Sequence, residues 1–180
     1  MFKKASEYNK NLSKLSFPLV EYKKLKNYHD LLNIRNNGMM GYITIDKINV
    51  SVPIYHSVKA SVLNESVGHM EGSSLPIGTN NSHSILSAHS GLSTKRLFTD
   101  LNKLEIGDVF VINVLNKELT YQVDKIVIVS PSDISHLEIE NNKDYVTLIT
   151  CTPYGINTHR LLVRGVRIEN ILEKKIIVTN

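Results

Sequence analysis

The chain has 180 residues, of which 42% are hydrophobic and 21% are charged, and its formal net charge is +4. These values are typical of a single folded domain and argue against a disordered chain. The sequence has no zinc-finger spacing, no recognition-helix signature and no interleaved aromatic and basic residues, so we expect no nucleic-acid partner. A single cysteine, Cys151, excludes an intramolecular disulfide and a multi-cysteine metal site.

Residues 1–35 have a helical pattern. Leucines and tyrosines recur every three or four positions between Leu12 and Leu32, which predicts an amphipathic segment with one apolar face. Pro18 should break or restart the helix. Seven lysines surround the apolar stripe, and they fit either a solvated helix face or attraction to an anionic membrane or wall surface. We therefore expect an N-terminal helical segment over residues 1–35 and a different structure over residues 36–180.

Beyond a turn at Asn36–Gly38, the pattern favours short strands. The expected strands cover residues 42–45, 50–54, 83–87, 109–115, 119–129, 145–150 and 160–168. Apolar and polar residues alternate through 119–124, and Asn116 and Lys117 suggest a hairpin turn before that run. Short helical pieces fit at 60–65 and 94–101. Many short strands without regular alternation of strand and helix predict a mostly β fold, either a barrel or a sandwich.

The stretch TLITCTPYGINTHR, residues 147–160, holds the cysteine. A lone cysteine is more often a buried apolar residue than a catalyst, so its surroundings decide. Two predicted strands flank a loop that contains Pro153 and Gly155, and antiparallel pairing across it would place Cys151 beside Arg160. A neighbouring cation favours the nucleophilic thiolate form of a cysteine, and a guanidinium can hold an oxyanion.

A thiol nucleophile also needs a proton carrier, and histidine is the usual choice. Among the seven histidines, His89 follows a predicted strand and precedes small residues, so its ring should project from a strand end. His159 is the rival, but consecutive strand residues face opposite sides, so it should face away if Arg160 faces the thiol. Thr150 either lines a substrate pocket or is a plain strand hydroxyl.

Four sequence blocks carry a family resemblance. TLITC followed by an arginine nine positions later resembles the signature of the sortases, the cysteine transpeptidases of Gram-positive surfaces, and SAHSGL resembles their histidine segment. The similarity is greatest to class C, the pilin-polymerising sortases. The blocks, which follow one another across residues 40–168, are MGYITIDKINVSVPIYH, GHMEGSSLPIG, HSILSAHSGLSTKRLFTDLNKLEIGD and DYVTLITCTPYGINTHRLLVRGVRI.

The resemblance implies an eight-stranded β-barrel with short helices and a two-step acyl transfer. Cys151 would attack the Thr carbonyl of an LPXTG-like sorting signal, His89 would protonate the departing Gly amine, and Arg160 would stabilise the oxyanion. A pilin lysine amine would then resolve the thioacyl intermediate. The implied partners are pilin or surface proteins with such a signal, and the implied location is the outer face of the cytoplasmic membrane. We expect no cofactor and no metal, because the carboxylates show no calcium-site spacing.

The chain also departs from the class C pattern. No Asp-Pro-aromatic lid tripeptide occurs between Asn9 and Leu32; the nearest feature is Phe17–Pro18. We expect the N-terminal segment to dock on the barrel as a helix and to leave the thiol open, so that its reactivity would not change when residues 1–35 are removed. Ser90 and Ser93 replace the usual Arg and Pro of the histidine segment, which should loosen that loop. No membrane anchor or signal peptide is evident, so we interpret the chain as a trimmed ectodomain.

Other functions stay open at this point. The chain could be a sortase that anchors surface proteins to the cell wall, a cysteine hydrolase that uses water as acceptor, or a non-catalytic β-barrel binding module whose cysteine belongs to the core. The last interpretation predicts an inert thiol. The first two differ from pilin polymerisation only in the acceptor.

Overall fold

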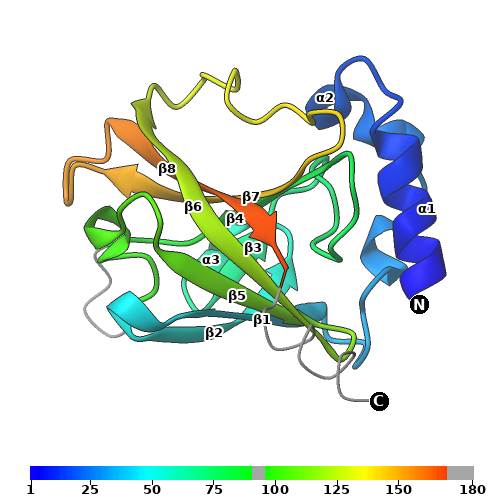
Figure 1. Ribbon diagram of the computed structural model, residues 1–180, viewed down its shortest axis with the longest axis horizontal. Coiled ribbons are helices and arrows are strands. Elements are labelled where there is room, and N and C mark those ends of the chain that lie inside the picture. The colour runs from blue at the N-terminus through cyan, green and yellow to red at the C-terminus, as the bar shows by residue number, and fades with distance from the viewer. Residues whose placement is uncertain (91–95, 170–180) are drawn as a thin grey trace.

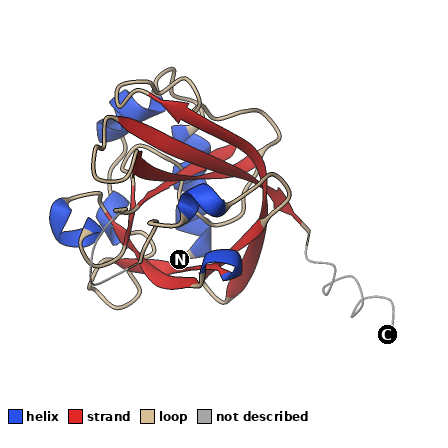
Figure 2. Cartoon of the chain, turned by 90° about the vertical axis from the view of Figure 1, so that its left-hand side faces the viewer, coloured by secondary structure: helices blue, strands red, loops and turns tan. Residues whose placement is uncertain are grey.

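Alternating apolar and polar residues give most strands one face for a shared interior. In the computed structural model, which describes residues 1–90 and 96–169, eight such strands form a closed barrel (Figures 1 and 2). Around the barrel the order is β1-β2-β3-β4-β7-β8-β6-β5. The strands are β1 Met39–Ile45, β2 Val50–His56, β3 Val67–His69, β4 Ser82–Ser87, β5 Val109–Val114, β6 Lys117–Val129, β7 Asp144–Thr152 and β8 His159–Ile168. The predicted mostly β fold is confirmed as a barrel.

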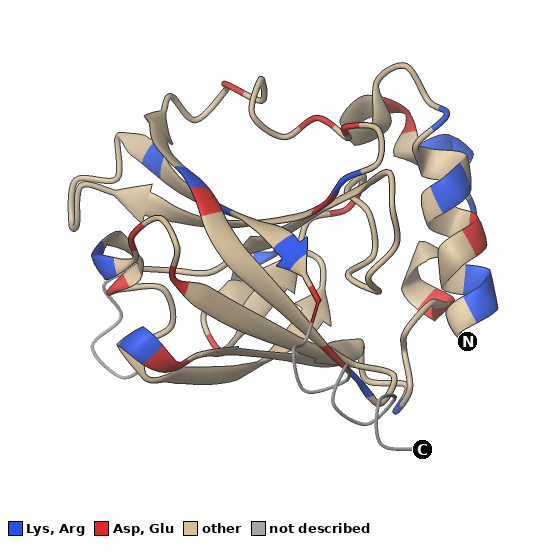
Figure 3. Ribbon diagram, viewed as in Figure 1, with Lys and Arg blue, Asp and Glu red and all other residues tan. Residues whose placement is uncertain are grey.

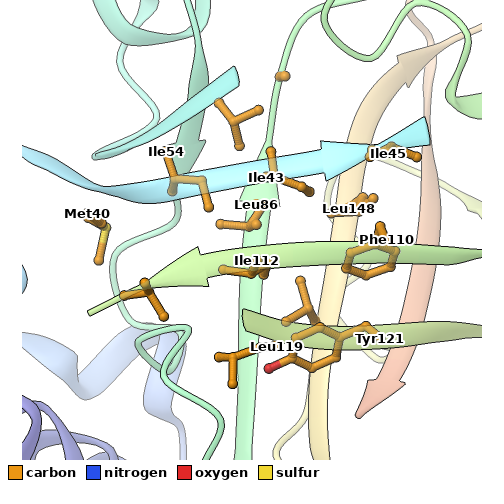
Figure 4. Close-up of a cluster of buried hydrophobic side chains, with 14 of the residues drawn as sticks. Met40, Ile43, Ile45, Ile54, Leu86, Phe110, Ile112, Leu119, Tyr121 and Leu148 are labelled. Atoms are coloured by element: carbon orange, nitrogen blue, oxygen red, sulfur yellow. The ribbon is translucent and has the colours of Figure 1, made fainter. Parts of the chain in front are cut away.

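The barrel interior is filled by aliphatic and aromatic side chains from all sides (Figure 4). Phe110 and Tyr121 stack with their ring centroids 5.6 Å apart. A Cβ atom added at Gly165 would lie 2.6 Å from the Phe110 ring, so only glycine leaves room for this pair. Leu119, Tyr121 and Val123 are buried and alternate with exposed or half-buried neighbours, as predicted.

The pairing pattern sets which strand ends meet. Most neighbouring strands are antiparallel, but β2 pairs with β3 in parallel and β4 pairs with β7 in parallel. The β4–β7 pair joins segments about 60 residues apart, with Ser87 opposite Ile149. As a result, the carboxyl ends of β4 and β7 lie together at one edge of the barrel, next to the start of β8.

The N-terminal segment packs on the barrel as short helices. Helix α1 covers Phe2–Leu12, and α2, Pro18–Glu21, begins at the proline that should restart the helix. The apolar residues of α1 join the barrel core. The side-chain amide of Asn9 donates to the Leu75 carbonyl at 2.9 Å, and its oxygen accepts a hydrogen bond from the Leu75 N–H at 2.7 Å. Lysines lie along the outer side of α1 (Figure 3). No helix of the described residues has the length and apolar character to cross a membrane.

Several sequence-based boundaries differ from the structure. The helical pattern of residues 1–35 is divided, because α1 ends at Leu12 and the 3-10 turns η1, Tyr22–Lys24, and η2, Tyr28–Asp30, follow α2. Strand β3 was not predicted. The hairpin turn uses Leu115 and Asn116, both with positive φ, one residue earlier than expected.

Of the two expected helical pieces, the first is shorter than predicted, and residues 96–100 of the second form turns and no helix. Helix α3 covers Ala60–Leu63, as the first of them predicts with a shorter span. Residues 94 and 95 of the second piece lie outside the described residues, and the 3-10 turn η4, Leu101–Lys103, begins at its last residue. A further 3-10 turn, η3, Asp46–Ile48, connects β1 and β2. Leu97, Phe98, Leu101 and Leu104 are all buried, which agrees with their predicted common side.

Candidate active site

Cys151 and Arg160 lie directly opposite each other. In the antiparallel register of β7 and β8, Cys151 pairs with Arg160, and Thr152 pairs with His159. Two residues before the cysteine, Ile149 packs with Leu162 in a hydrophobic cluster outside the main barrel core. Since side chains two apart on a strand share a face, Cys151 and Arg160 lie on this outer face. The neighbourhood predicted from the nine-residue spacing is confirmed.

A tight loop produces this pairing. The carbonyl of Pro153 accepts hydrogen bonds from the N–H groups of Ile156 and Asn157, at 3.1 and 2.9 Å. Gly155 and Asn157 have φ angles of +75° and +62°, a region that glycine and asparagine adopt most easily. The chain therefore reverses within a few residues, and β8 begins level with the end of β7.

The guanidinium of Arg160 fixes the loop and keeps donors free. Its Nη1 donates to the carbonyls of Asn157 and His159, at 3.2 and 2.9 Å. Its Nε and Nη2 groups donate no hydrogen bond to any of the residues that the structure describes. A guanidinium has five N–H donors, so about three remain available for a ligand. The side chain is half-buried, as is that of Cys151.

His89 is held close to the cysteine by the β4–β7 pairing. The N–H of Ala88 donates to the carbonyl of Ile149 at 3.2 Å, and the Thr150 hydroxyl donates to the carbonyl of Ala88 at 2.8 Å. On the other side of the histidine, the Ser90 hydroxyl donates to the carbonyl of Cys151 at 2.9 Å. His89 thus lies between two residues that contact Thr150 and Cys151, and the three predicted residues lie at one edge of the barrel.

Comparison with known proteins agrees with this arrangement. The family model described as a sortase domain matches residues 43–168. This chain belongs to the sortase family. Its fold is similar to that of sortase C1 from Streptococcus agalactiae, with 49% identity, a TM-score of 0.84, and coverage of 93% of this chain and 88% of the other. The sortase C of Streptococcus pneumoniae, studied for its pilin substrate specificity, is 40% identical, with a TM-score of 0.83 over 94% and 86% of the two chains.

A more distant sequence relative belongs to the same family. Sortase D of Bacillus subtilis is 30% identical over 131 residues, which are 71% of this chain and 63% of that protein. The chain therefore spans less than two thirds of the length of this relative. Sortases are cysteine transpeptidases, and the structural neighbours are class C sortases, so the resemblance seen in the sequence is confirmed.

Other histidines of this sortase are structural or exposed. His159 is exposed, and its Nδ1 lies 2.9 Å from the Thr158 hydroxyl. His69 and His83 are buried, and burial lowers the pKa of each to about 4, so both are neutral at pH 7. The ring nitrogens of His56 lie 2.9 and 2.8 Å from the carbonyls of Gly38 and Leu31.

The outer face next to Cys151 carries a second apolar cluster. It consists of the buried residues Ile85, Val129, Leu137, Ile149 and Leu162. Farther along lies a cavity of about 310 Å³ between residues 13–20 of the N-terminal segment and the β6–β7 loop, with His83 in its lining. Leu19 packs against this second apolar cluster. The sequence did not reveal the cluster or the cavity, because their residues come from separate segments with ordinary strand or helix patterns.

No metal site emerges from the described residues. Within residues 1–90 and 96–169, no group of three or more histidine, cysteine, aspartate or glutamate side chains is arranged to hold a metal ion.

The accessibility of Cys151 gives a first prediction. Removal of residues 1–35 would take Leu12, Tyr28 and Leu32 out of the core, so a point substitution is the better probe. Cys151 does not line the cavity beside residues 13–20. We therefore expect Leu19→Ala to leave the alkylation rate of Cys151 by a small thiol reagent within about twofold of the wild-type rate.

Mass spectrometry can follow this labelling, because Cys151 is the single cysteine. Val20→Ala, at the exposed neighbouring position, is the matched control. If Leu19→Ala accelerated labelling many-fold while Val20→Ala did not, the N-terminal segment would shield the thiol and the expectation of an open site would be wrong.

Proposed function

We propose that this protein is a pilin-polymerising transpeptidase, with Cys151 as nucleophile, His89 as proton carrier and Arg160 as oxyanion clamp. The observation that carries the proposal is the register that sets Cys151 opposite Arg160, beside the segment that holds His89. Similarity to class C sortases supports the choice of pilin subunits as partners.

The first step would cleave the sorting signal. The proton of the Cys151 thiol passes to His89, and the sulfur attacks the Thr carbonyl carbon of an LPXTG-like segment, so that a C–S bond forms and the carbonyl oxygen becomes an oxyanion. The free donors of Arg160 stabilise this charge as it develops, which lowers the barrier more than binding of the ground state would. His89 donates a proton to the Gly nitrogen as the C–N bond breaks, so that the leaving group departs as a neutral amine.

The second step would transfer the acyl group. A lysine amine of the next pilin subunit attacks the thioester carbon, and His89 accepts the proton that the amine loses. The C–S bond then breaks, an amide bond forms, and His89 returns the proton to the sulfur, which regenerates the thiol. These steps use only a thiol, an imidazole and a guanidinium, so they require neither a metal nor a cofactor.

Thr150 has a supporting part in this proposal. Its side chain is only 4% exposed, and its hydroxyl donates to the carbonyl of Ala88. It therefore holds the histidine segment against β7. We place the enzyme on the extracellular face of a Gram-positive cytoplasmic membrane, where substrates with an LPXTG-like signal are displayed.

The acceptor separates this function from its alternatives. We expect the protein, incubated with a fluorogenic LPXTG peptide and a pilin-derived peptide that contains one lysine, to form an amide-linked product that mass spectrometry detects. The same acceptor peptide with Arg in place of Lys keeps the charge but lacks a nucleophilic amine, and it should give no such product. An amine that mimics a cell-wall peptide tests the wall-anchoring alternative.

Each other outcome selects a different function. Cleavage at a rate and with products unchanged by any amine would indicate a cysteine hydrolase. Transfer only to the wall-type amine would indicate anchoring of surface proteins. No cleavage of the peptide by a folded protein would contradict the proposal altogether.

A further inference from the structure

The hydroxyl of Ser90 connects the histidine segment to the main chain of the cysteine. Ser90 directly follows His89, and its Oγ donates to the carbonyl oxygen of Cys151 at 2.9 Å, across 61 residues of sequence. The sequence alone suggested that a serine at this position loosens the loop. The structure shows that its side chain replaces part of the missing backbone pairing.

Backbone pairing ends just before the histidine. Strand β4 stops at Ser87, and the last backbone hydrogen bond from this segment to β7 is the one from the Ala88 N–H to the Ile149 carbonyl. The contact of Thr150 also ends at Ala88. After His89, the contact of the described residues in this segment with β7 is the hydrogen bond of the Ser90 hydroxyl, and its acceptor is the carbonyl of Cys151.

A second contact holds the histidine main chain from the other side. The N–H of Phe98 donates to the carbonyl of His89 at 3.2 Å, and Phe98 is fully buried in the barrel core. The main chain at His89 is therefore fixed by Ala88, by Phe98 and by the Ser90 hydroxyl. Only the last of these links the histidine segment directly to the residue that carries the thiol.

Such a link affects catalysis through geometry. Proton transfer requires the imidazole within hydrogen-bond reach of the reacting atoms, about 2.6–3.2 Å. A displacement of about 1 Å can reduce a rate by as much as a hundredfold. Because Ser90 is one residue from His89 and its acceptor belongs to Cys151, the bond fixes the distance between the two segments where that distance matters for the reaction.

We propose that Ser90 is a positioning residue for the transfer reaction: its hydroxyl, bound to the Cys151 carbonyl, holds His89 in register with the thiol. This inference rests on the proposed function, in which His89 and Cys151 act on the same acyl group. Ser90 itself touches neither the substrate nor the reacting atoms in this scheme.

The test compares two variants of nearly equal shape. Ser90→Thr keeps the hydroxyl, whereas Ser90→Val replaces it with a methyl group. In the assay with the fluorogenic LPXTG peptide and the lysine acceptor, we expect Ser90→Val to lower kcat about tenfold with KM within about twofold of the wild-type value. Ser90→Thr should recover most of kcat.

Ser84→Ala is the matched control for a purely structural effect. The Ser84 hydroxyl also donates to a backbone carbonyl, that of Ser74, at 2.6 Å, and Ser84 lies on the same strand that leads to His89. Its loss should lower the midpoint of thermal unfolding but leave kcat unchanged. Ser90→Ala serves as a second hydroxyl-free variant in case the larger valine prevents folding.

The outcomes separate the inference from the proposed function. If the wild-type protein processes the peptide and Ser90→Val or Ser90→Ala has the same kcat, the proposed role of Ser90 is overturned, whereas the proposed function stands. Equal losses in Ser90→Val and Ser90→Thr would show that the hydroxyl is not what matters, which also overturns it. If the folded wild-type protein does not process the peptide, the proposed function fails and the inference fails with it.

Discussion

Cys151→Ala is expected to abolish transfer of the sorting peptide, with a loss of about 10⁴-fold or more, while the protein stays folded. Without the sulfur no thioacyl intermediate can form, and removal of a nucleophile leaves only the residual effect of binding and oxyanion stabilisation. The half-buried thiol contributes little to packing, so the midpoint of thermal unfolding should change by only a few degrees. Turnover is measured by fluorescence, and the intermediate is sought by mass spectrometry after rapid quenching.

Substitution of either of the other two proposed catalytic residues should also reduce turnover. His89→Ala and Arg160→Ala are each expected to lower turnover by about 10²-fold or more, through loss of the proton carrier and of the oxyanion donors. His159→Ala is the control at the same barrel edge, because His159 is exposed and pairs with Thr152. Full activity in Cys151→Ala would show that Cys151 is not the nucleophile, and a comparable loss in His159→Ala would indicate a general disturbance of the edge.

The sequence predicted the parts of the site that depend on local spacing. Cys151 and Arg160 flank one short loop between two strands, so the hairpin geometry alone places them together. His89 could be assigned only as a strand-end residue, because its approach to Cys151 depends on the parallel pairing of β4 with β7, about 60 residues apart. No local pattern encodes which distant strand will be the neighbour.

The same limit explains the missed elements of the fold. Strand β3, Val67–His69, has three residues and is too short for a period-two pattern; it exists because β2 and β4 supply hydrogen bonds on its two sides. The contact of Ser90 with the Cys151 carbonyl was equally hidden, since a serine after the histidine suggested only a flexible loop. In both cases the partner is remote in sequence.

Acidification from pH 7 to pH 4 is expected to reduce the free energy of unfolding by several kcal/mol, because two buried histidines must stay neutral. His69 lies 2.8 Å from both the Tyr28 hydroxyl and the Ser74 carbonyl, and His83 lies 2.7 Å from both the Thr147 hydroxyl and the Glu138 carbonyl. Burial lowers the pKa of each ring to about 4, from 6.5. Their contribution is complete above pH 6.5 and is lost as the pH falls toward 4, at about 3 kcal/mol each.

A buried carboxyl group acts in the opposite direction. Burial raises the pKa of Asp144 to about 6, although hydrogen bonds from the hydroxyls of Ser82 and Tyr121 favour its charged form. The stability that this group contributes is present below its unfolded pKa of 3.8 and is lost as the pH rises through 6, so acidification recovers about 2 kcal/mol. The two histidines outweigh it, and the expected net loss by pH 4 is about 4 kcal/mol.

Two variants separate these terms in urea unfolding experiments at pH 7 and pH 4. His83→Gln keeps a neutral polar side chain, and it should reduce the acid-induced loss by about 3 kcal/mol. Asp144→Asn cannot ionise, so it should increase the loss by about 2 kcal/mol. Since the changes have opposite signs at sites that share the same barrel, a general weakening of the fold cannot produce both. An acid-induced loss unchanged in both variants would show that other groups control the acid sensitivity of this sortase.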